Sequence, residues 1–399
     1  MKVGIVREGK TKTDSRVPLT PKQCRYLLDK ERDLQIFVQP SPDRCFTDSE
    51  YRSQDIPLAE NLEMCDLLLG IKEVPISMLL PNKTYLFFSH TIKKQPYNRE
   101  LLRSILQQKI RLIDYECLRD ENGRRVIAFG RWAGIVGGHN AILTWGRRSR
   151  KFHLKPMHQC HDWAEAQTHY QNLPLSNIKL VVTGEGRVAN GATEVLDLMK
   201  IKRVSSQAFL EQNFHEPVYT QLTVKDMYRK TGSASFDETH YYQHPEQYES
   251  IFEPYTHTAN IMLNGIYWDR RIPVFFSQED MKRENFTIRV IADVTCDIAP
   301  NSSIPATIRA SSIAEPIYGY DPVLERETQP FQSHGIDVMA VDNLPNELPR
   351  DASEDFGERL ISTVWAELNR TDSRIIYEAT IALNGNLNQP YEYLRDYVS

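Results

Sequence analysis

Four charged or titratable residues in the first third of the sequence each follow an apolar run. Arg16 lies in a loop after the first run, and Lys72, His90 and Glu116 come shortly after three later ones. Arginine binds a carboxylate through two hydrogen bonds, histidine transfers protons near neutral pH, and a partly buried lysine can act as a base. Singly, such residues are more often surface charges or packed core histidines. Their repeated placement at predicted strand ends indicates that they converge on one site.

A second candidate site is a glycine turn near the middle of the chain. A short apolar run, Leu180 to Val182, enters the pattern Gly184-x-Gly186-x-x-Ala189, and apolar residues then recur at helical intervals. Glycines allow a bound group to approach the backbone, and the start of the next helix offers unpaired N–H groups to a pyrophosphate. The predicted dinucleotide-binding residues at this turn are Gly184, Gly186, Arg187, Val188 and Gly191. The alternative is a strand-to-helix turn that binds nothing.

Together, a dinucleotide site and a cluster of arginine, lysine and histidine are typical of hydride transfer to or from an amino acid or its imine.

The amino-acid composition agrees with such an enzyme. The 399 residues are 41% apolar and 25% charged with a formal net charge of -5, which predicts a globular protein without affinity for nucleic acid or an anionic membrane. No long apolar run predicts a signal peptide or a membrane span, so we expect a cytoplasmic protein.

The length of 399 residues predicts two domains, because a chain of this size exceeds what a single hydrophobic core usually includes. Strand-like and helix-like segments alternate along residues 1–130, and residues 132–146 predict a helix that carries the chain into a second domain. The fold class expected is α/β, with two Rossmann-like lobes, parallel sheets and an interdomain cleft. Residues 1–132 with 336–399 would form the substrate domain, and residues 133–335 the dinucleotide-binding domain.

Residues 151–176 hold four histidines together with Cys160. Their spacing matches neither a paired-cysteine zinc module nor the His-Glu-x-x-His pattern on a helix. We therefore expect no metal.

Several longer motifs resemble one enzyme family. Gly70-Ile-Lys-Glu-Val-Pro75, Phe87-Phe-Ser-His-Thr-Ile-Lys93 and Val341-Asp-Asn-Leu-Pro345 are similar to runs in lysine-ketoglutarate reductases, the lysine-forming saccharopine dehydrogenases. More broadly they resemble alanine dehydrogenase and the nucleotide-binding part of transhydrogenase. The resemblance implies an enzyme that condenses L-lysine with 2-oxoglutarate and reduces the imine to saccharopine with NADP or NAD. Its partners would be small amino-acid and 2-oxo-acid substrates, and it would be a monomer or a homodimer.

The resemblance also implies roles for individual residues. Lys72 and His90 would be the catalytic acid/base pair, Arg16 and Arg125 would hold substrate carboxylates, and Glu116 would tune the charge around them. The residues implied to bind the cofactor outside the glycine turn are Asn264, Asp293, Asp342 and Leu344.

The choice between NAD and NADP depends on the segment after the second strand of the nucleotide fold. An acidic residue about twenty positions after the glycine turn would bind the adenine ribose of NAD, but the sequence there reads Arg203-Val-Ser-Ser-Gln207. Ser205 and Ser206 can donate to a 2′-phosphate beside Lys202, so we expect NADP to be used at least as well as NAD. The alternative is that Glu211 folds back to the ribose.

Two other functions stay open. One is an amino-acid dehydrogenase of the alanine type, or an imine reductase with another amine and keto acid. The other is a Rossmann protein that senses a nucleotide without catalysis.

Overall fold

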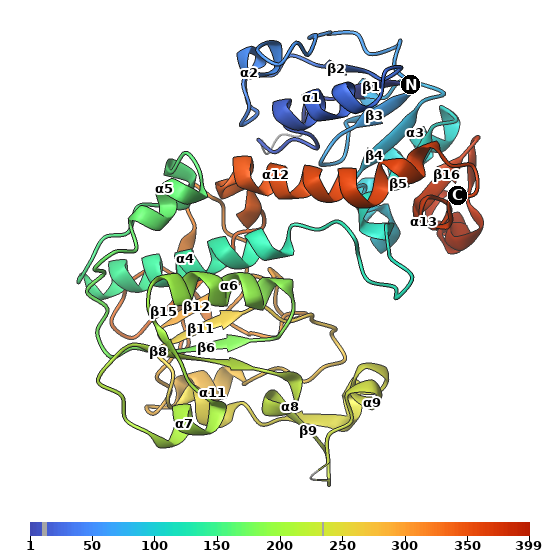
Figure 1. The fold of residues 1–399 in the computed structure, drawn as a ribbon. Helices are drawn as coiled ribbons and strands as arrows, with labels where there is room; N and C mark the ends of the chain where they lie inside the picture. The colour runs from blue at the N-terminus through green and yellow to red at the C-terminus, as the bar shows by residue number, and fades with distance from the viewer. Residues whose placement is uncertain (10–13, 234) are drawn as a thin grey trace. The chain divides into compact units, whose positions relative to one another are not determined.

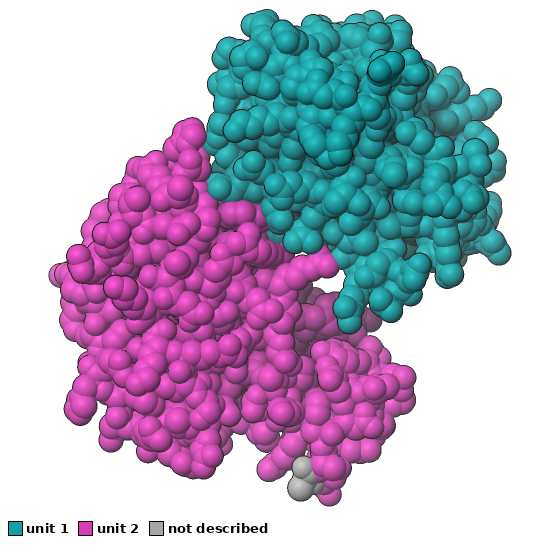
Figure 2. Space-filling view, in the orientation of Figure 1, with its two compact units in different colours: residues 1–129, 349–399 teal, residues 130–348 magenta. Residues whose placement is uncertain are grey.

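The computed structural model describes residues 1–9, 14–233 and 235–399. These divide into two compact units, unit 1 with residues 1–129 and 349–399 and unit 2 with residues 130–348 (Figure 2). Each has its own largely parallel sheet. Residues 336–348 were expected in the first domain, but strand β15 (Ile336–Met339) pairs in parallel with β12 (Val290–Asp293) of unit 2. The chain therefore returns to unit 1 at Pro349.

Unit 1 contains a seven-stranded sheet in the order β17-β16-β5-β4-β3-β1-β2. Its parallel strands are β1 (Lys2–Ile5), β2 (Gln35–Val38), β3 (Leu67–Leu69), β4 (Thr84–Phe87) and β5 (Arg111–Asp114). Its antiparallel strands, from the end of the chain, are β16 (Thr380–Leu383) and β17 (Asn386–Leu387). The carboxyl ends of β1, β3, β4 and β5 therefore meet at one edge of the sheet.

Both faces of the unit 1 sheet are covered, as the continuous apolar strands predict. Leu67 and Leu69 belong to one core cluster and Leu68 to another, because successive side chains of a strand point to opposite faces. The returning segment completes the first cluster, since Phe356 packs against Tyr115 at a centroid distance of 4.9 Å. The helices of unit 1 are α1 (Pro21–Lys30), α2 (Asp48–Arg52), α3 (Arg99–Gln107), α12 (Pro349–Arg359), α13 (Arg374–Ala379) and α14 (Arg395–Val398).

Unit 2 contains an eight-stranded sheet in the order β14-β13-β15-β12-β11-β6-β8-β7. With β12 and β15, the parallel strands are β6 (Lys179–Thr183), β7 (Lys202–Arg203), β8 (Val218–Leu222) and β11 (Ile261–Asn264). The antiparallel strands are β13 (Ile317–Asp321) and β14 (Arg326–Thr328), and a separate hairpin holds β9 (Tyr228–Lys230) and β10 (Tyr248–Ser250). The helices are α4 (Gly130–Ser149), α5 (Trp163–Thr168), α6 (Arg187–Leu198), α7 (Ser206–Glu211), α8 (Val224–Met227), α9 (Glu238–Gln243), α10 (Glu253–Thr256) and α11 (Gln278–Lys282).

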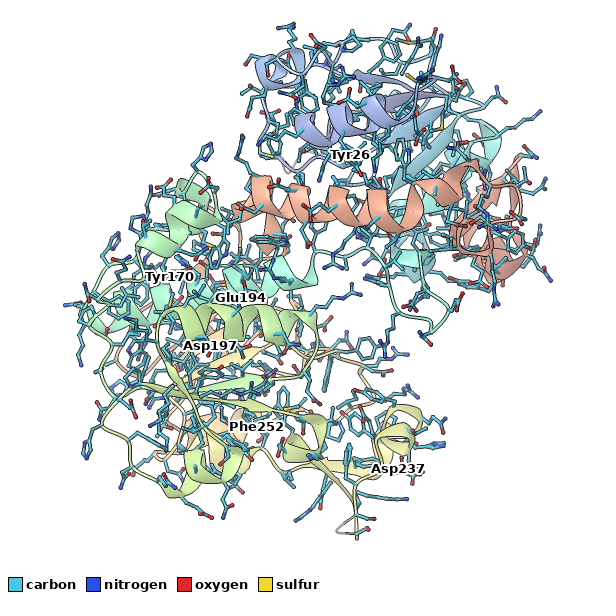
Figure 3. The ribbon with its side chains drawn as sticks, in the orientation of Figure 1. Tyr26, Tyr170, Glu194, Asp197, Asp237 and Phe252 are labelled. Atoms are coloured by element: carbon cyan, nitrogen blue, oxygen red, sulfur yellow. The ribbon has the colours of Figure 1, made fainter. Side chains whose placement is uncertain are left out.

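Helix α4 lies directly against α6, the helix that follows the glycine turn (Figure 1). A Cβ atom on Gly134 would lie 1.9 Å from the carbonyl oxygen of Val188, and one on Gly191 would lie 2.1 Å from that of Arg131. Only glycine allows the two backbones to approach this closely. Glu194, labelled in Figure 3, also joins the helices through Arg131 at 2.6 Å. Gly191 was expected to bind the cofactor, but its position in the structure is explained by this packing.

Among the described residues, no helix is long and apolar enough to cross a membrane.

The helix contact makes a prediction about stability. Alanine normally stabilises a helix relative to glycine by about 1 kcal/mol, but Gly191→Ala should destabilise unit 2 by about 1–3 kcal/mol, because the new methyl group overlaps the Arg131 carbonyl. Thermal and urea unfolding would measure the change. Gly186→Ala is the matched control, since a Cβ there has no atom within 4 Å. Equal stability of both variants would contradict the packing role of Gly191.

Candidate functional site

His90 and Glu73 form the centre of the unit 1 site. His90 follows β4 with a left-handed backbone (φ 52°), and its Nδ1 lies 2.9 Å from Oε1 of Glu73, which follows β3. The imidazole is 23% exposed while Glu73 is buried. A carboxylate at Nδ1 favours the tautomer that carries its proton there, which leaves Nε2 to exchange a proton with a substrate.

Glu116, which follows β5, is surrounded by cations. Arg125 Nη2 pairs with its Oε1, and Lys93 Nζ lies 3.4 Å from the same atom. Burial alone would raise the pKa of Glu116, but Arg125, Lys93 and His90 together hold it below its ordinary value. The carboxylate therefore stays ionised. Its Oε2 is buried and has no hydrogen-bond partner among the described residues.

Arg16 is fixed by its own loop. Its Nε and Nη2 donate to the two carboxylate oxygens of Asp14 at 2.9 and 2.5 Å, and its guanidinium carbon lies 4.2 Å from the centre of the Phe129 ring. The side chain is almost fully buried. A planar, preoriented guanidinium of this kind suits recognition of a carboxylate.

Asp114 joins the turns after β4 and β5. Its carboxylate accepts hydrogen bonds from the backbone N–H and the hydroxyl of Ser89 at 2.9 and 2.5 Å, and from the N–H of Glu116 at 2.7 Å. Burial raises its pKa despite these bonds. Asp114 thus positions the residue before His90 and the backbone of Glu116 itself.

Lys72 follows β3, and its backbone N–H donates to Glu8 at the end of β1 at 2.9 Å. The structure therefore places Arg16, Lys72, His90 and Glu116 after the carboxyl ends of neighbouring parallel strands, as expected. Arg125 joins them through Glu116.

Sequence reasoning missed four residues of this site: Glu8, Glu73, Lys93 and Asp114. A signal existed for two of them, because Glu73 directly follows Lys72 and Lys93 lies one helical turn after His90. Glu8 and Asp114 bond to the backbone of distant residues, and no sequence spacing shows such contacts.

The glycine turn of unit 2 has the geometry expected for a dinucleotide. Gly184 has a φ of 96°, and a Cβ there would lie 3.0 Å from the carbonyl oxygen of Gly265. Gly186 caps α6 and has open space on its side-chain side, while Arg187 and Val188 begin the helix. An open backbone at a helix N-terminus fits a pyrophosphate. Gly184, Gly186, Arg187 and Val188 are thus placed as expected.

Asn264 and Asp293 lie at the carboxyl ends of β11 and β12, but their side chains are fully buried. Asn264 Nδ2 donates to Asp293 Oδ1 at 3.0 Å, and Thr307 Oγ1 donates to Oδ2 at 2.7 Å. Burial raises the pKa of Asp293 although these bonds oppose the shift. Both side chains thus hold strand ends and loops together. Because they are fully buried, their geometry gives no sign of the expected contact with the cofactor.

Asp342 and Leu344 lie in the turn after β15, with Asp342 exposed and Leu344 buried. The end of this turn is bound to α4, because Asn140 Nδ2 donates to the buried Glu347 at 2.8 Å. Helix α4 thus helps to position both the glycine-turn helix and the turn at Asp342.

The predicted ribose-binding residues, Ser205 and Ser206, follow an edge strand and not the strand that neighbours β6. Strand β7 lies at the edge of the sheet, and β8 is the neighbour of β6. Thr183 pairs with Leu222, so Thr223 lies opposite Gly184. Ser205 instead caps α7, and Ser206 Oγ donates to Asp226 at 3.4 Å. From the sequence, the first strand after α6 was taken as the neighbour of β6 in the sheet.

One group of residues outside these sites has ligand atoms within 4.8 Å of one another: Cys160, Glu165 and His169. Glu165 is already paired with the ammonium of Lys155 and accepts the N–H of His161 at 2.8 Å. That ammonium supplies the positive charge a metal would bring. The absence of a metal remains a prediction.

Comparisons with known proteins agree with the resemblance seen in the motifs. The family model for the alanine dehydrogenase/PNT N-terminal domain matches residues 4–136. An alpha-aminoadipic semialdehyde synthase of Arabidopsis thaliana is 32% identical over 98% of this chain and 41% of its own length. A saccharopine dehydrogenase [NAD(+), L-lysine-forming] of Yarrowia lipolytica is 28% identical over 93% of each protein. The chain thus spans less than half of the first relative and nearly all of the second.

A solved L-alanine dehydrogenase has the same fold, with a TM-score of 0.67 and 14% identity over the whole of both chains. The expected α/β fold class is therefore confirmed. Residues 4–136 match the alanine dehydrogenase/PNT N-terminal domain family, and nearly the whole chain is similar in sequence to lysine-forming saccharopine dehydrogenases and alpha-aminoadipic semialdehyde synthases.

Proposed function

We propose that this chain is a nicotinamide-dependent oxidoreductase that reduces the imine of L-lysine and 2-oxoglutarate to saccharopine in a reversible reaction. The observation that carries the proposal is the cluster after β3, β4 and β5, where a histidine bound to a buried glutamate lies among cations. The relatives named as lysine-forming saccharopine dehydrogenases support the same reaction. The cytoplasmic location and the monomer or homodimer remain predictions from the sequence.

The residues of unit 1 have distinct tasks in this proposal. The lysine amine attacks the carbonyl carbon of 2-oxoglutarate, and His90 takes a proton from the nitrogen. His90 passes this proton to the alkoxide oxygen, and the neutral carbinolamine forms. The proton that Lys72 has taken from the lysine ammonium then protonates the hydroxyl group, which leaves as water and gives the protonated imine. Lys72 keeps the reacting amine neutral by accepting its proton. The cofactor, when bound, supplies the hydride that reduces the C=N bond.

The carboxylates around His90 support proton transfer. Glu73 lies at Nδ1, so it orients the ring and stabilises the imidazolium that forms during the transfer. Glu116 stays ionised and offsets the positive charge of Arg125 and Lys93. Arg16 and Arg125 would bind substrate carboxylates, which 2-oxoglutarate and lysine both bring.

The glycine turn and the first residues of α6 would hold the pyrophosphate of the dinucleotide, and the turn at Asp342 and Leu344 would lie near the nicotinamide. Asn264 and Asp293 would act by holding the strand ends in register.

An amino-acid dehydrogenase of the alanine type is the second candidate, favoured by the fold shared with L-alanine dehydrogenase. Oxidation of NADH or NADPH should be measured with 2-oxoglutarate, pyruvate and glyoxylate, each alone and with lysine or ammonia. The proposal expects turnover with 2-oxoglutarate and lysine together. Turnover with pyruvate and ammonia alone would favour the second candidate, and no turnover with any pair would favour a nucleotide sensor.

The catalytic roles predict a clear loss of turnover. His90→Gln and Lys72→Met should each lower kcat by about 100- to 10,000-fold, as loss of a general acid or base does, while cofactor affinity changes little. Steady-state kinetics and cofactor titration would measure both. The matched controls are His215→Gln and Lys22→Met, which alter exposed residues elsewhere. Full turnover in either test variant would disprove the role of that residue.

Cofactor choice depends on Asp226, the acid nearest the end of β8. Its carboxylate accepts from the N–H and hydroxyl of Thr223 at 2.9 and 2.7 Å, so it is held beside the position opposite Gly184. A carboxylate there accepts from a ribose hydroxyl and repels a 2′-phosphate. The expected use of NADP rested on Ser205 and Ser206, and the strand order now favours NAD.

We therefore expect wild-type protein to bind NADH more tightly than NADPH, and Asp226→Ser to shift the ratio of the two Kd values toward NADPH by about tenfold, or ~1.4 kcal/mol. Fluorescence titration of each reduced cofactor would measure the ratio. Glu211→Gln, which removes the other candidate acid, should leave it unchanged. Tighter binding of NADPH to the wild-type protein would show that Asp226 does not face the ribose.

A further inference from the structure

Glu8 links two strand ends below the candidate active site. It follows β1, and its two carboxylate oxygens accept hydrogen bonds from consecutive backbone N–H groups after β3, Ile71 to Oε1 at 2.7 Å and Lys72 to Oε2 at 2.9 Å. A carboxylate that accepts two adjacent N–H groups fixes the direction of that segment. The segment is the one from which Lys72 projects.

Two charged residues and two polar groups surround Glu8. Asp14 and Arg16 act on it through their charges from the loop after β1, Lys72 acts through its backbone N–H after β3, and Tyr115 interacts with it from the turn after β5. Burial and the charge of Asp14 raise the pKa of Glu8 to about 8, although the two N–H groups and Arg16 oppose the shift. Ionising this carboxyl below about pH 8 therefore costs stability.

We propose that Glu8 is a positioning residue for Lys72, which fixes the backbone of Lys72 through its two hydrogen bonds without touching the substrate. The proposal rests on the proposed function for its kinetic consequence, but its structural part does not depend on the reaction. A protonated carboxyl or an amide cannot accept both N–H groups equally well, because one of its two polar atoms then carries hydrogen. Only the ionised carboxylate holds the segment at both points.

The test compares Glu8→Gln with wild type, with Glu63→Gln as the matched control because Glu63 is exposed on the same unit. Hydrogen exchange by mass spectrometry should show faster exchange in the peptide that contains Ile71 and Lys72 in Glu8→Gln alone. Unchanged exchange there would overturn the proposal whether or not the protein is active. This readout separates its failure from failure of the proposed function.

Kinetics and pH give the second test. Glu8→Gln should lower kcat by about 10- to 100-fold, the scale expected for a misplaced catalytic group, with little change in cofactor affinity. His90 and Lys72 also accept protons in the proposed reaction, so only part of a rise of the wild-type kcat toward about pH 8 belongs to Glu8. The ratio of the wild-type kcat to the Glu8→Gln kcat should therefore rise with pH toward about 8. A variant with full activity, or a ratio that does not change with pH, would overturn the proposal.

The free energy of unfolding should change with pH in the direction opposite to kcat. A carboxyl whose folded pKa is raised favours the folded state when protonated, so that contribution is present below its ordinary value of 4.5 and is lost as pH rises to about 8. Over that range, wild-type protein should lose stability relative to Glu8→Gln in urea unfolding. A glutamate that only stabilised the fold would not give the wild-type protein a higher kcat, relative to Glu8→Gln, over the same pH range in which its relative stability falls.

Discussion

The candidate chemistry depends on one constraint, that parallel strands bring their carboxyl ends to the same edge of a sheet. In unit 1 this places residues after β1, β3, β4 and β5 in hydrogen-bond contact although they are far apart in the sequence. In unit 2 the same rule gathers the glycine turn, Asn264 and Asp293. Hydrogen bonds from strand end to strand end then set the positions of the individual groups.

Charge compensation is the second requirement of the unit 1 site. Cations that suit dicarboxylate substrates would repel one another in an interior without anions. Glu116 and Asp14 meet this need for Arg125 and Arg16, and Glu73 does so for His90 when its ring is protonated. In the proposed reaction, the same carboxylates would allow His90 and Lys72 to exchange protons close to fixed positive charges.

Strand ends and the glycine turn were predictable because they depend on local patterns. Apolar runs followed by Lys72, His90 and Glu116 indicated a parallel sheet with these residues at one edge, and the structure has that arrangement. Long-range features were not predictable in the same way. Strand β8 lies between β6 and β7, so Ser205 does not follow the strand that neighbours β6, and the contact of α6 with α4 explains Gly191 as a packing residue.

The boundary of unit 2 shows the same limit. A strand at 336–339 looks equally suited to either sheet, and only its pairing with β12 assigns it. The roles of Glu8 and Asp114 could not be predicted, because their partners are backbone N–H groups that follow other strands. Such contacts leave no pattern in the sequence.

The proposed reaction of this chain is reduction of the C=N bond formed between lysine and 2-oxoglutarate. The most direct measurement is mass spectrometry of the product formed with lysine, 2-oxoglutarate and a reduced nicotinamide cofactor deuterated at the transferable position. We predict saccharopine with one deuterium on the carbon that was the carbonyl carbon of 2-oxoglutarate. Deuterium found only in an amino acid made from a keto acid and ammonia, or in no product, would contradict it.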